Sequence, residues 1–251
     1  MRAATRVAGT AAAVAAALAL ASACSTGTDP GADTSGSAET GSLSSMSDWL
    51  GCDVFADLEA LQETLGVTAV EGELQSDGLN EGVDAEAAGC SGLFDLAAFS
   101  DTQGSFDYES TGDAAIRAGL APWAGEEEAA ANFADRVGVR EDNPAGLDYT
   151  DEQEGELGGE WDESLTVTAE TAHRTYVDVY GRYGSWVVYV SVDYLHDPGV
   201  GAYESAPELY PDSSAEQLAV YPFTTAQFTD WISQEYLPQV QSDILERVES
   251  E

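Results

Sequence analysis

The sequence predicts a single α+β domain, a mostly antiparallel sheet with flanking helices, that follows a signal peptide and a disordered tether. Apolar and polar residues alternate over residues 165–195, which favours consecutive strands. Apolar residues recur at helical spacing both before and after that region. We assign the domain to residues 47–251, a length that suits one hydrophobic core.

The strand signals are clearest over residues 165–169, 175–180 and 186–194, and residues 105–109 form a shorter candidate. A turn at residues 181–184 pairs the last two long strands, with Val179 opposite Trp186. One face of this hairpin is then uniformly apolar. The other face carries Tyr176, Asp178, Tyr189 and Asp193, which suits a wet or partly covered surface.

Three helices are expected. The first covers residues 53–65, and Gly66 ends it in the left-handed conformation. A second runs over residues 126–138, opening with three glutamates at the positive end of its dipole. The third begins after Thr224 or Thr225, and Pro238 should kink or divide it.

Residues 1–23 read as a signal peptide, with a short basic start and a long uncharged stretch. That stretch is about 16 residues long, fewer than the roughly 20 that a membrane-spanning helix needs. It ends Leu20-Ala21-Ser22-Ala23-Cys24, which resembles a bacterial lipobox, so we expect Cys24 to become the lipid-modified first residue, carrying palmitate-type acyl chains. The alternative is an ordinary signal peptide cut after Ala23, which leaves Cys24 as a free thiol.

Residues 24–46 read as a lipid-anchored, disordered tether of Ser, Thr, Gly, Asp and Ala, because this composition buries too little to offset chain entropy. Two acyl chains on one cysteine would give stable anchoring. The expected location is the extracellular face of the cell membrane, with the membrane itself as a partner through the N-terminal lipid.

The charge balance excludes several functions. The chain has 47 acidic residues and eight basic ones, and its formal net charge is −39. Nucleic acid is therefore not expected as a partner, because phosphates would be repelled. All the basic residues are arginine, so no Schiff base, P-loop lysine or Ser-x-x-Lys site can form. The acidity fits either codon bias or adaptation to salt.

Two cysteines remain once Cys24 is acylated. Cys52 and Cys90 would then form a disulfide, the usual state in an oxidising compartment.

Candidate catalytic groups are few, and we expect no catalytic residue, cofactor or metal site. In the hairpin register above, His173 and His196 are about 13 Å apart, too far to share a metal ion. Gly-x-Ser-x-Gly, His-Glu-x-x-His and Gly-x-Gly-x-x-Gly are missing from the sequence. Residues 148–163 are rich in acids but lack the order of a calcium loop, so we expect a solvated acidic loop there.

A ligand groove is most plausible along residues 195–223, a long turn-rich connection, because long ordered loops often form binding sites. Tyr203 and Tyr210 from this connection, with Tyr176 and Tyr189 from the hairpin, are the speculative ligand-binding residues. An irregular covering loop is the plainer alternative.

The lipobox, the tether, a first helix that opens at Cys52 and ends at Leu65-Gly66, and the second cysteine Cys90 resemble the small secreted lipoproteins of actinobacteria. Among these, residues 20–110 loosely resemble a domain-of-unknown-function lipoprotein family. The chain has Ser91-Gly92-Leu93 where such proteins often carry an aromatic residue. The resemblance implies an envelope location and no known activity.

The expected function is therefore that of a lipid-anchored extracytoplasmic binding or accessory lipoprotein, without catalysis, for an unknown envelope ligand or protein. One alternative is a secreted hydrolase with a carboxylate- or Ser-based site. Another is a sensory or structural envelope spacer.

Overall fold

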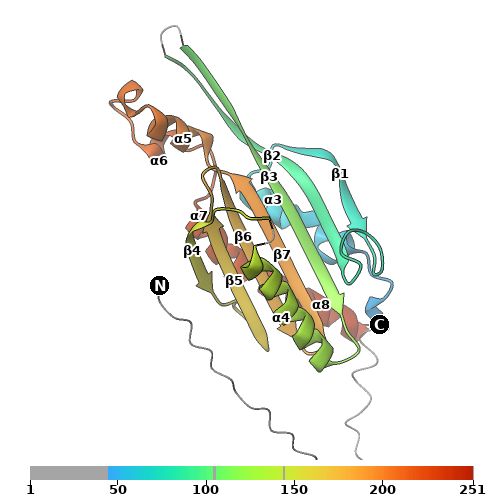
Figure 1. The fold of residues 1–251 in the computed structure, drawn as a ribbon. Coiled ribbons are helices and arrows are strands. Elements are labelled where there is room, and N and C mark those ends of the chain that lie inside the picture. The colour runs from blue at the N-terminus through green and yellow to red at the C-terminus, as the bar shows by residue number, and fades with distance from the viewer. Residues whose placement is uncertain (1–44, 104–105, 144, 251) are drawn as a thin grey trace, which may run out of the picture. The chain divides into compact units, whose positions relative to one another are not determined.

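The computed structural model describes residues 45–103, 106–143 and 145–250, which fold around one seven-stranded sheet (Figure 1). Neighbouring strands are antiparallel throughout, in the order β1-β2-β3-β7-β6-β5-β4. The predicted α+β class with a mostly antiparallel sheet is confirmed. The strands are β1 (Ala69–Asp77), β2 (Ala88–Gln103), β3 (Phe106–Pro122), β4 (Thr150–Gly155), β5 (Glu163–Glu170), β6 (Arg174–Tyr183) and β7 (Trp186–Leu195).

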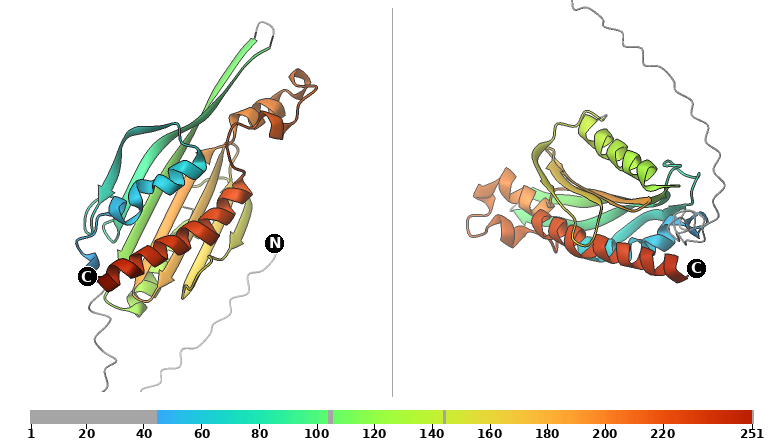
Figure 2. Two further views of the ribbon diagram at one scale, coloured as in Figure 1. Left: turned by 180° about the vertical axis from the view of Figure 1, so that it is seen from behind. Right: turned by 90° about the horizontal axis from the view of Figure 1, so that it is seen from below.

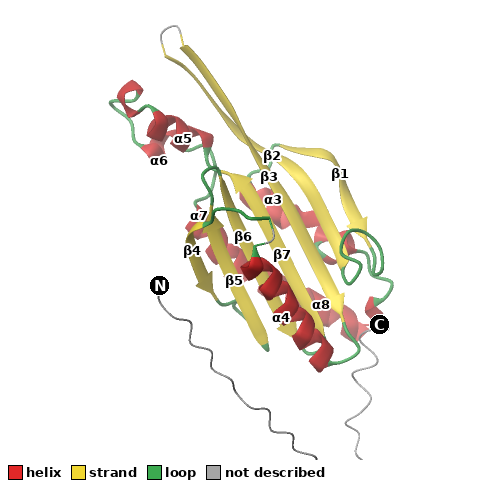
Figure 3. Cartoon of the chain, viewed as in Figure 1, coloured by secondary structure: helices red, strands yellow, loops and turns green. Residues whose placement is uncertain are grey.

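Helices lie on both faces of the sheet. Helix α4 lies over β6 and β7 on one face, whereas α3 and the long C-terminal helix lie on the other (Figures 2 and 3). None of the helices in the described residues is both long and apolar enough to cross a membrane. The helical segments are α2 (Gly51–Val54), η1 (Ala56–Leu58), α3 (Glu59–Leu65), α4 (Glu126–Asp142), α5 (Pro198–Ser205), η2 (Pro207–Leu209), α6 (Ala215–Leu218), α7 (Thr225–Trp231), η3 (Ile232–Tyr236) and α8 (Leu237–Ser250).

The start of the folded part is slightly earlier than expected. The predicted signal peptide, Cys24 and the tether up to residue 44 lie outside the described residues. Met46, which the sequence analysis placed in the tether, is 1% exposed and belongs to the main core. It packs there with Trp49 and the first helical turns, so its side chain contributes to the domain.

The β6–β7 hairpin has a different register from the predicted one. Val179 pairs with Val190, and the turn is Gly184-Ser185 rather than residues 181–184. Gly181 lies within β6, where a Cβ would come within 2.6 Å of the Trp161 ring, so this glycine makes room for packing. The shift is four residues and therefore leaves each side chain on the predicted face. The apolar face is buried as expected, and Val177, Val179, Val188, Val190 and Val192 are its most buried aliphatic side chains.

Two of the predicted helices differ in detail. The first is broken, because Ala56, Asp57 and Leu58 all have positive φ angles between α2 and α3. Gly66 does end α3 with a φ of 65°. The third helix begins at the predicted capping residue, Thr224, and the chain stays helical through Pro238. A π-helical turn, η3, ends two residues before Pro238, and a bulge of this kind accommodates a proline, which cannot donate a backbone hydrogen bond.

Four strands were missed or shortened in the sequence analysis. Within the candidate strand at residues 105–109, residues 106–109 begin the much longer β3, which pairs along most of its length with β2. Both strands are rich in Ala, Gly and Asp, residues with weak strand preference. The acidic stretch predicted as a loop contains β4, an exposed edge strand. Its charges suit an edge, because they discourage pairing with another chain.

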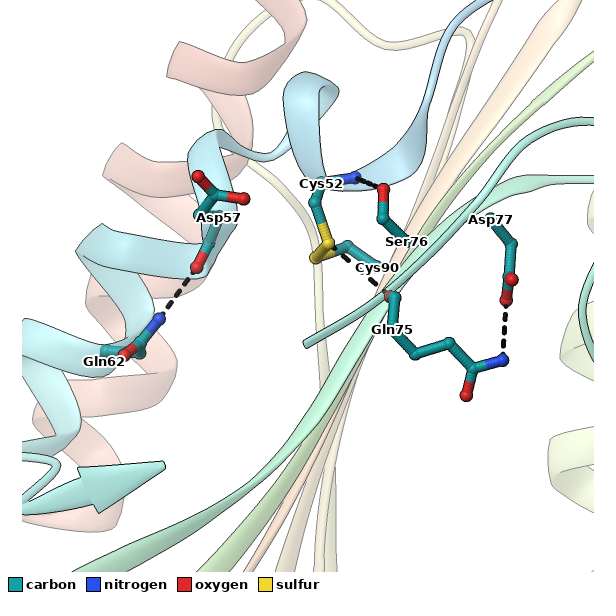
Figure 4. The surroundings of a disulfide bond; sticks show 7 residues. All are labelled: Cys52, Asp57, Gln62, Gln75, Ser76, Asp77 and Cys90. Carbon is teal, nitrogen blue, oxygen red and sulfur yellow. Dashed lines mark hydrogen bonds between the residues drawn. A yellow bond between two sulfur atoms is a disulfide. The ribbon is translucent and has the colours of Figure 1, made fainter. Parts of the chain in front are cut away.

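The predicted disulfide is present. Cys52 on α2 is bonded to Cys90 on β2, with their Cα atoms 4.6 Å apart (Figure 4). The backbone N–H of Cys52 also donates to Ser76 Oγ on β1 at 3.1 Å. These contacts attach the first helical turn to two neighbouring strands, so the disulfide has a structural role.

Candidate functional site

The two histidines lie directly opposite each other, which corrects the predicted 13 Å separation. With the observed register, the hairpin ladder ends at Arg174 and Leu195, and the next residues are His173 and His196. The backbone N–H of His196 donates to the carbonyl of His173 at 2.9 Å. The predicted pairing register was wrong by four residues, and this error had separated the two histidines.

Residues that follow the hairpin form a small lobe made of α5, η2 and α6, which corresponds to the long connection predicted as a groove. Asp197 closes this lobe at its base. Its Oδ1 accepts the N–H groups of Gly199 and Val200 at 2.8 and 3.0 Å, which caps α5. Its Oδ2 accepts those of Val220 and Tyr221 at 2.8 and 2.7 Å. One carboxylate therefore joins the two ends of the lobe.

The lobe packs against the projecting part of the β2–β3 hairpin. Phe99 on β2, Ala202 on α5 and Tyr210 form a separate small core. Within the lobe, Gly199 is required for close packing, since a Cβ there would lie 1.8 Å from the carbonyl oxygen of Leu218. These contacts give the lobe a defined position beside the sheet.

A cleft of about 1030 Å³ lies between the lobe, the histidine end of the hairpin, β3 and the start of α7. This volume is in the range of sites that hold small organic ligands. The aromatic side chains that line it are Tyr108, Tyr194, Tyr221 and Phe223.

Hydrogen bonds hold two of these aromatic residues in place. Tyr194 donates to Thr225 Oγ1 at 3.1 Å, and Tyr221 donates to the carbonyl of Leu195 at 3.1 Å. Burial raises the pKa of the Tyr221 phenol, and the carboxylate of Asp197 raises it further. Tyr221 therefore stays a neutral hydrogen-bond donor. Its ring stacks on Phe223 with a centroid distance of 5.4 Å, so this wall of the cleft is preorganised.

The carboxylate groups that line the cleft are acceptors. Glu170, Glu204 and Glu216 line it together with Asp197, and no arginine does. His196 adds an unused group, because its Nε2 atom is buried without a hydrogen-bond partner. A buried polar atom without a hydrogen bond lowers the stability of the fold. This cost indicates that a ligand or a water molecule forms the hydrogen bond to His196 Nε2. The acids favour a neutral or cationic ligand with an aromatic or apolar face.

The four tyrosines predicted to bind a ligand are not brought together. Tyr203 and Tyr210 pack in the small core between the lobe and β2, outside the cleft lining. Tyr176 lines a second, smaller pocket on the α4 face. Tyr189 lies beneath α4, where its hydroxyl donates to Asp84 Oδ2 at 2.8 Å. The predicted segment is therefore at the cleft, but other aromatic residues form its walls.

The cleft residues that the sequence analysis missed come from distant elements. Tyr108 and Tyr194 come together because the sheet order places β3 beside β7, and Phe223 joins them from the segment before α7. Besides the turn-rich segment at residues 195–223, the sequence signal for this cleft was the histidine pair. Recognising that pair required the correct register of the β6–β7 hairpin. Within the described part of the chain, no three His, Cys, Asp or Glu side chains are arranged to hold a metal ion.

Comparisons of the chain with protein-family models, with curated proteins and with solved structures found no match.

Proposed function

We propose that the protein is a lipid-anchored extracytoplasmic binding protein that holds a small neutral or cationic ligand in the cleft beside His196 and does no covalent chemistry. The observation that carries this proposal is the cleft itself, of about 1030 Å³, whose lobe is fixed at its base by Asp197. A binding site is tighter when it is preorganised, because less entropy is lost on binding.

The histidines favour binding over a hydrolase. Nucleophilic catalysis needs a base in hydrogen-bond contact with its nucleophile and with an orienting group. Among the described residues, neither His173 nor His196 has a side-chain hydrogen bond to a carboxylate or hydroxyl group. Asp197 is already saturated by four backbone N–H groups, so it is not available to orient a histidine.

A pair of glycines gives a matched test of the cleft. Gly201 on α5 lines the cleft, and a Cβ added there meets no atom within 4 Å. Gly138 on α4 has the same open space but lies away from the cleft. Gly201→Trp should fill the cleft without disturbing the backbone, whereas Gly138→Trp should leave it open.

The measurement is the thermal stability of the full chain in the presence of amino acids, small amines and mono- and disaccharides. A ligand that binds only the folded state raises the midpoint of unfolding in a concentration-dependent way. We expect at least one compound to do so for the wild type and for Gly138→Trp, but not for Gly201→Trp. No stabilising compound, or equal stabilisation of both variants, would count against the binding function.

The anchor is tested separately. If Cys24 is acylated, the mature protein partitions with membranes and its N-terminal peptide carries the mass of the lipid. Cys24→Ser should release the protein from the membrane fraction without changing its thermal stability. An unmodified Cys24 thiol would contradict the anchor and the tether together.

A further inference from the structure

A second pocket, on the opposite side of the hairpin from the cleft, gathers an unusual share of the positive charge. Three of the six arginines in the described residues line it, although the chain as a whole has a net charge of −39. They are Arg117 on β3 and Arg136 and Arg140 on α4. The pocket has a volume of about 270 Å³ and lies between α4 and the polar face of β6 and β7.

The acids that face this pocket are already engaged. Asp178 accepts hydrogen bonds from Ser191 at 2.5 Å and from Arg140 Nε at 3.0 Å, and it is buried. Asp193 accepts from Arg174 Nε at 2.7 Å. Arg140 is itself shared between Asp178 and Glu152. These pairs neutralise one another, and Arg136 is paired with Asp84 at 2.7 Å, so Arg117 is the one arginine of this pocket without an acidic partner among the described residues.

The groups without a partner are donors. Arg117 is exposed, and its side chain makes no hydrogen bond or ion pair with any described residue. Arg136 binds Asn132 and Asp84 through Nε and Nη1, but its Nη2 atom is buried without a partner. The phenol of Tyr180 also has no hydrogen bond within the described chain, and burial raises its pKa, so it stays protonated. Hydrogen-bond donors without a partner favour a ligand that is rich in hydrogen-bond acceptors.

We propose that this pocket binds a small oxyanion, a carboxylate or phosphate group, anchored by Arg117 with Arg136 and Tyr180 beside it. Guanidinium groups match both oxyanions because their planar fork can donate two parallel hydrogen bonds. The pocket volume of about 270 Å³ suits a small group of this kind rather than a larger organic ligand. This site is independent of the proposed binding function of the cleft.

The strongly acidic surface makes the proposal easy to test, since it repels anions everywhere else. The probes are inorganic phosphate and acetate, titrated at constant ionic strength into the full chain, with the side-chain Nε–Hε signals of the arginines followed by NMR. We expect saturable shifts at Arg117 and Arg136 and none at Arg247, which stacks on Trp49 on a different element.

Arg117→Gln should weaken binding of the probe about tenfold, because a charge-assisted hydrogen bond is lost. Arg247→Gln removes the same charge elsewhere and should leave the affinity unchanged. Saturation by phosphate alone assigns a phosphate-bearing ligand, saturation by acetate alone a carboxylate, and saturation by both a general oxyanion site. Non-saturating shifts, or equal affinity in Arg117→Gln and the wild type, would overturn the proposal. None of these outcomes tests ligand binding in the cleft, so the two proposals can fail independently.

Discussion

The carboxylate of Asp197 accepts the backbone N–H of Val220 across 2.8 Å, and this contact joins the first and last residues of the lobe that forms one wall of the cleft. The same side chain caps α5 through its other oxygen. The closure of the lobe at its base therefore depends on this one side chain, in addition to the packing of the lobe against β2.

Asp197→Ala should destabilise the protein by about 2–4 kcal/mol, because it removes a helix cap and leaves two further backbone N–H groups without an acceptor. Hydrogen exchange should increase selectively over residues 198–221. Asp212→Ala is the control, since Asp212 is exposed in the same lobe and has no hydrogen bond to a described residue. Equal exchange rates in the two variants would show that Asp197 does not hold the lobe.

The sequence was sufficient to predict the strands and faces of the central hairpin, because valines at alternate positions give a strong period-two signal. It was insufficient for the register. Both Gly181 and Gly184 could form the turn as far as the sequence shows. The packing of Trp161 on Gly181 places Gly181 within β6 and leaves the turn at Gly184. The histidine pair depended on this choice, which is why the sequence analysis separated two residues that are neighbours.

The strands β2 and β3 also could not be predicted from the sequence, and the reason is different. Their glycines are sites of close packing rather than turns. A Cβ at Gly112 would lie 2.3 Å from the Tyr221 hydroxyl, and one at Gly119 would lie 2.4 Å from the Tyr189 ring. The partners are far away in sequence, so local propensity carries no information about them.

Asp84 should give the stability of the protein a characteristic pH dependence. Burial raises the pKa of this carboxyl group, but the hydrogen bond and charge of Arg136 and the hydroxyl of Tyr189 outweigh burial and lower the pKa below its usual value. A group whose pKa is lower in the folded state stabilises the fold above its unfolded pKa, about 3.9, and loses this contribution as the pH falls below it.

Asp84→Asn should therefore lower stability by about 1–2 kcal/mol at pH 7, and the difference from the wild type should disappear as the pH falls from about 4 to 2. Urea unfolding at several pH values measures this. Glu81→Gln, with the same loss of charge in the same loop, should show no such convergence. A constant difference across the pH range would contradict the role of Asp84.

The contact between α2 and β2 should be intolerant of a single methyl group. A Cβ at Gly51 would lie 2.1 Å from the backbone of Gly89, and backbone atoms cannot move aside as a flexible side chain can. Gly51→Ala should cost about 1–3 kcal/mol by overpacking. A Cβ at Gly89 has no atom of Gly51 within 4 Å, and its nearest neighbour is the Ala118 carbonyl oxygen at 3.9 Å, so Gly89→Ala should be tolerated. Thermal unfolding of both variants compares them directly, and equal midpoints would mean that α2 is free to shift.

Removal of the Cys52–Cys90 disulfide should cost about 2–4 kcal/mol, because the cross-link restricts the unfolded chain over a separation of 38 residues. The double variant Cys52→Ala/Cys90→Ala should unfold at lower urea concentration than the oxidised wild type, and the reduced wild type should resemble the variant. Comparison of these two samples separates the covalent link from the packing of the buried sulfur atoms. The slope of the transition should also increase, since the unfolded chain without the cross-link exposes more surface. Equal midpoints before and after reduction would show that the packing of α2 against the strands, rather than the bond, stabilises this end of the sheet.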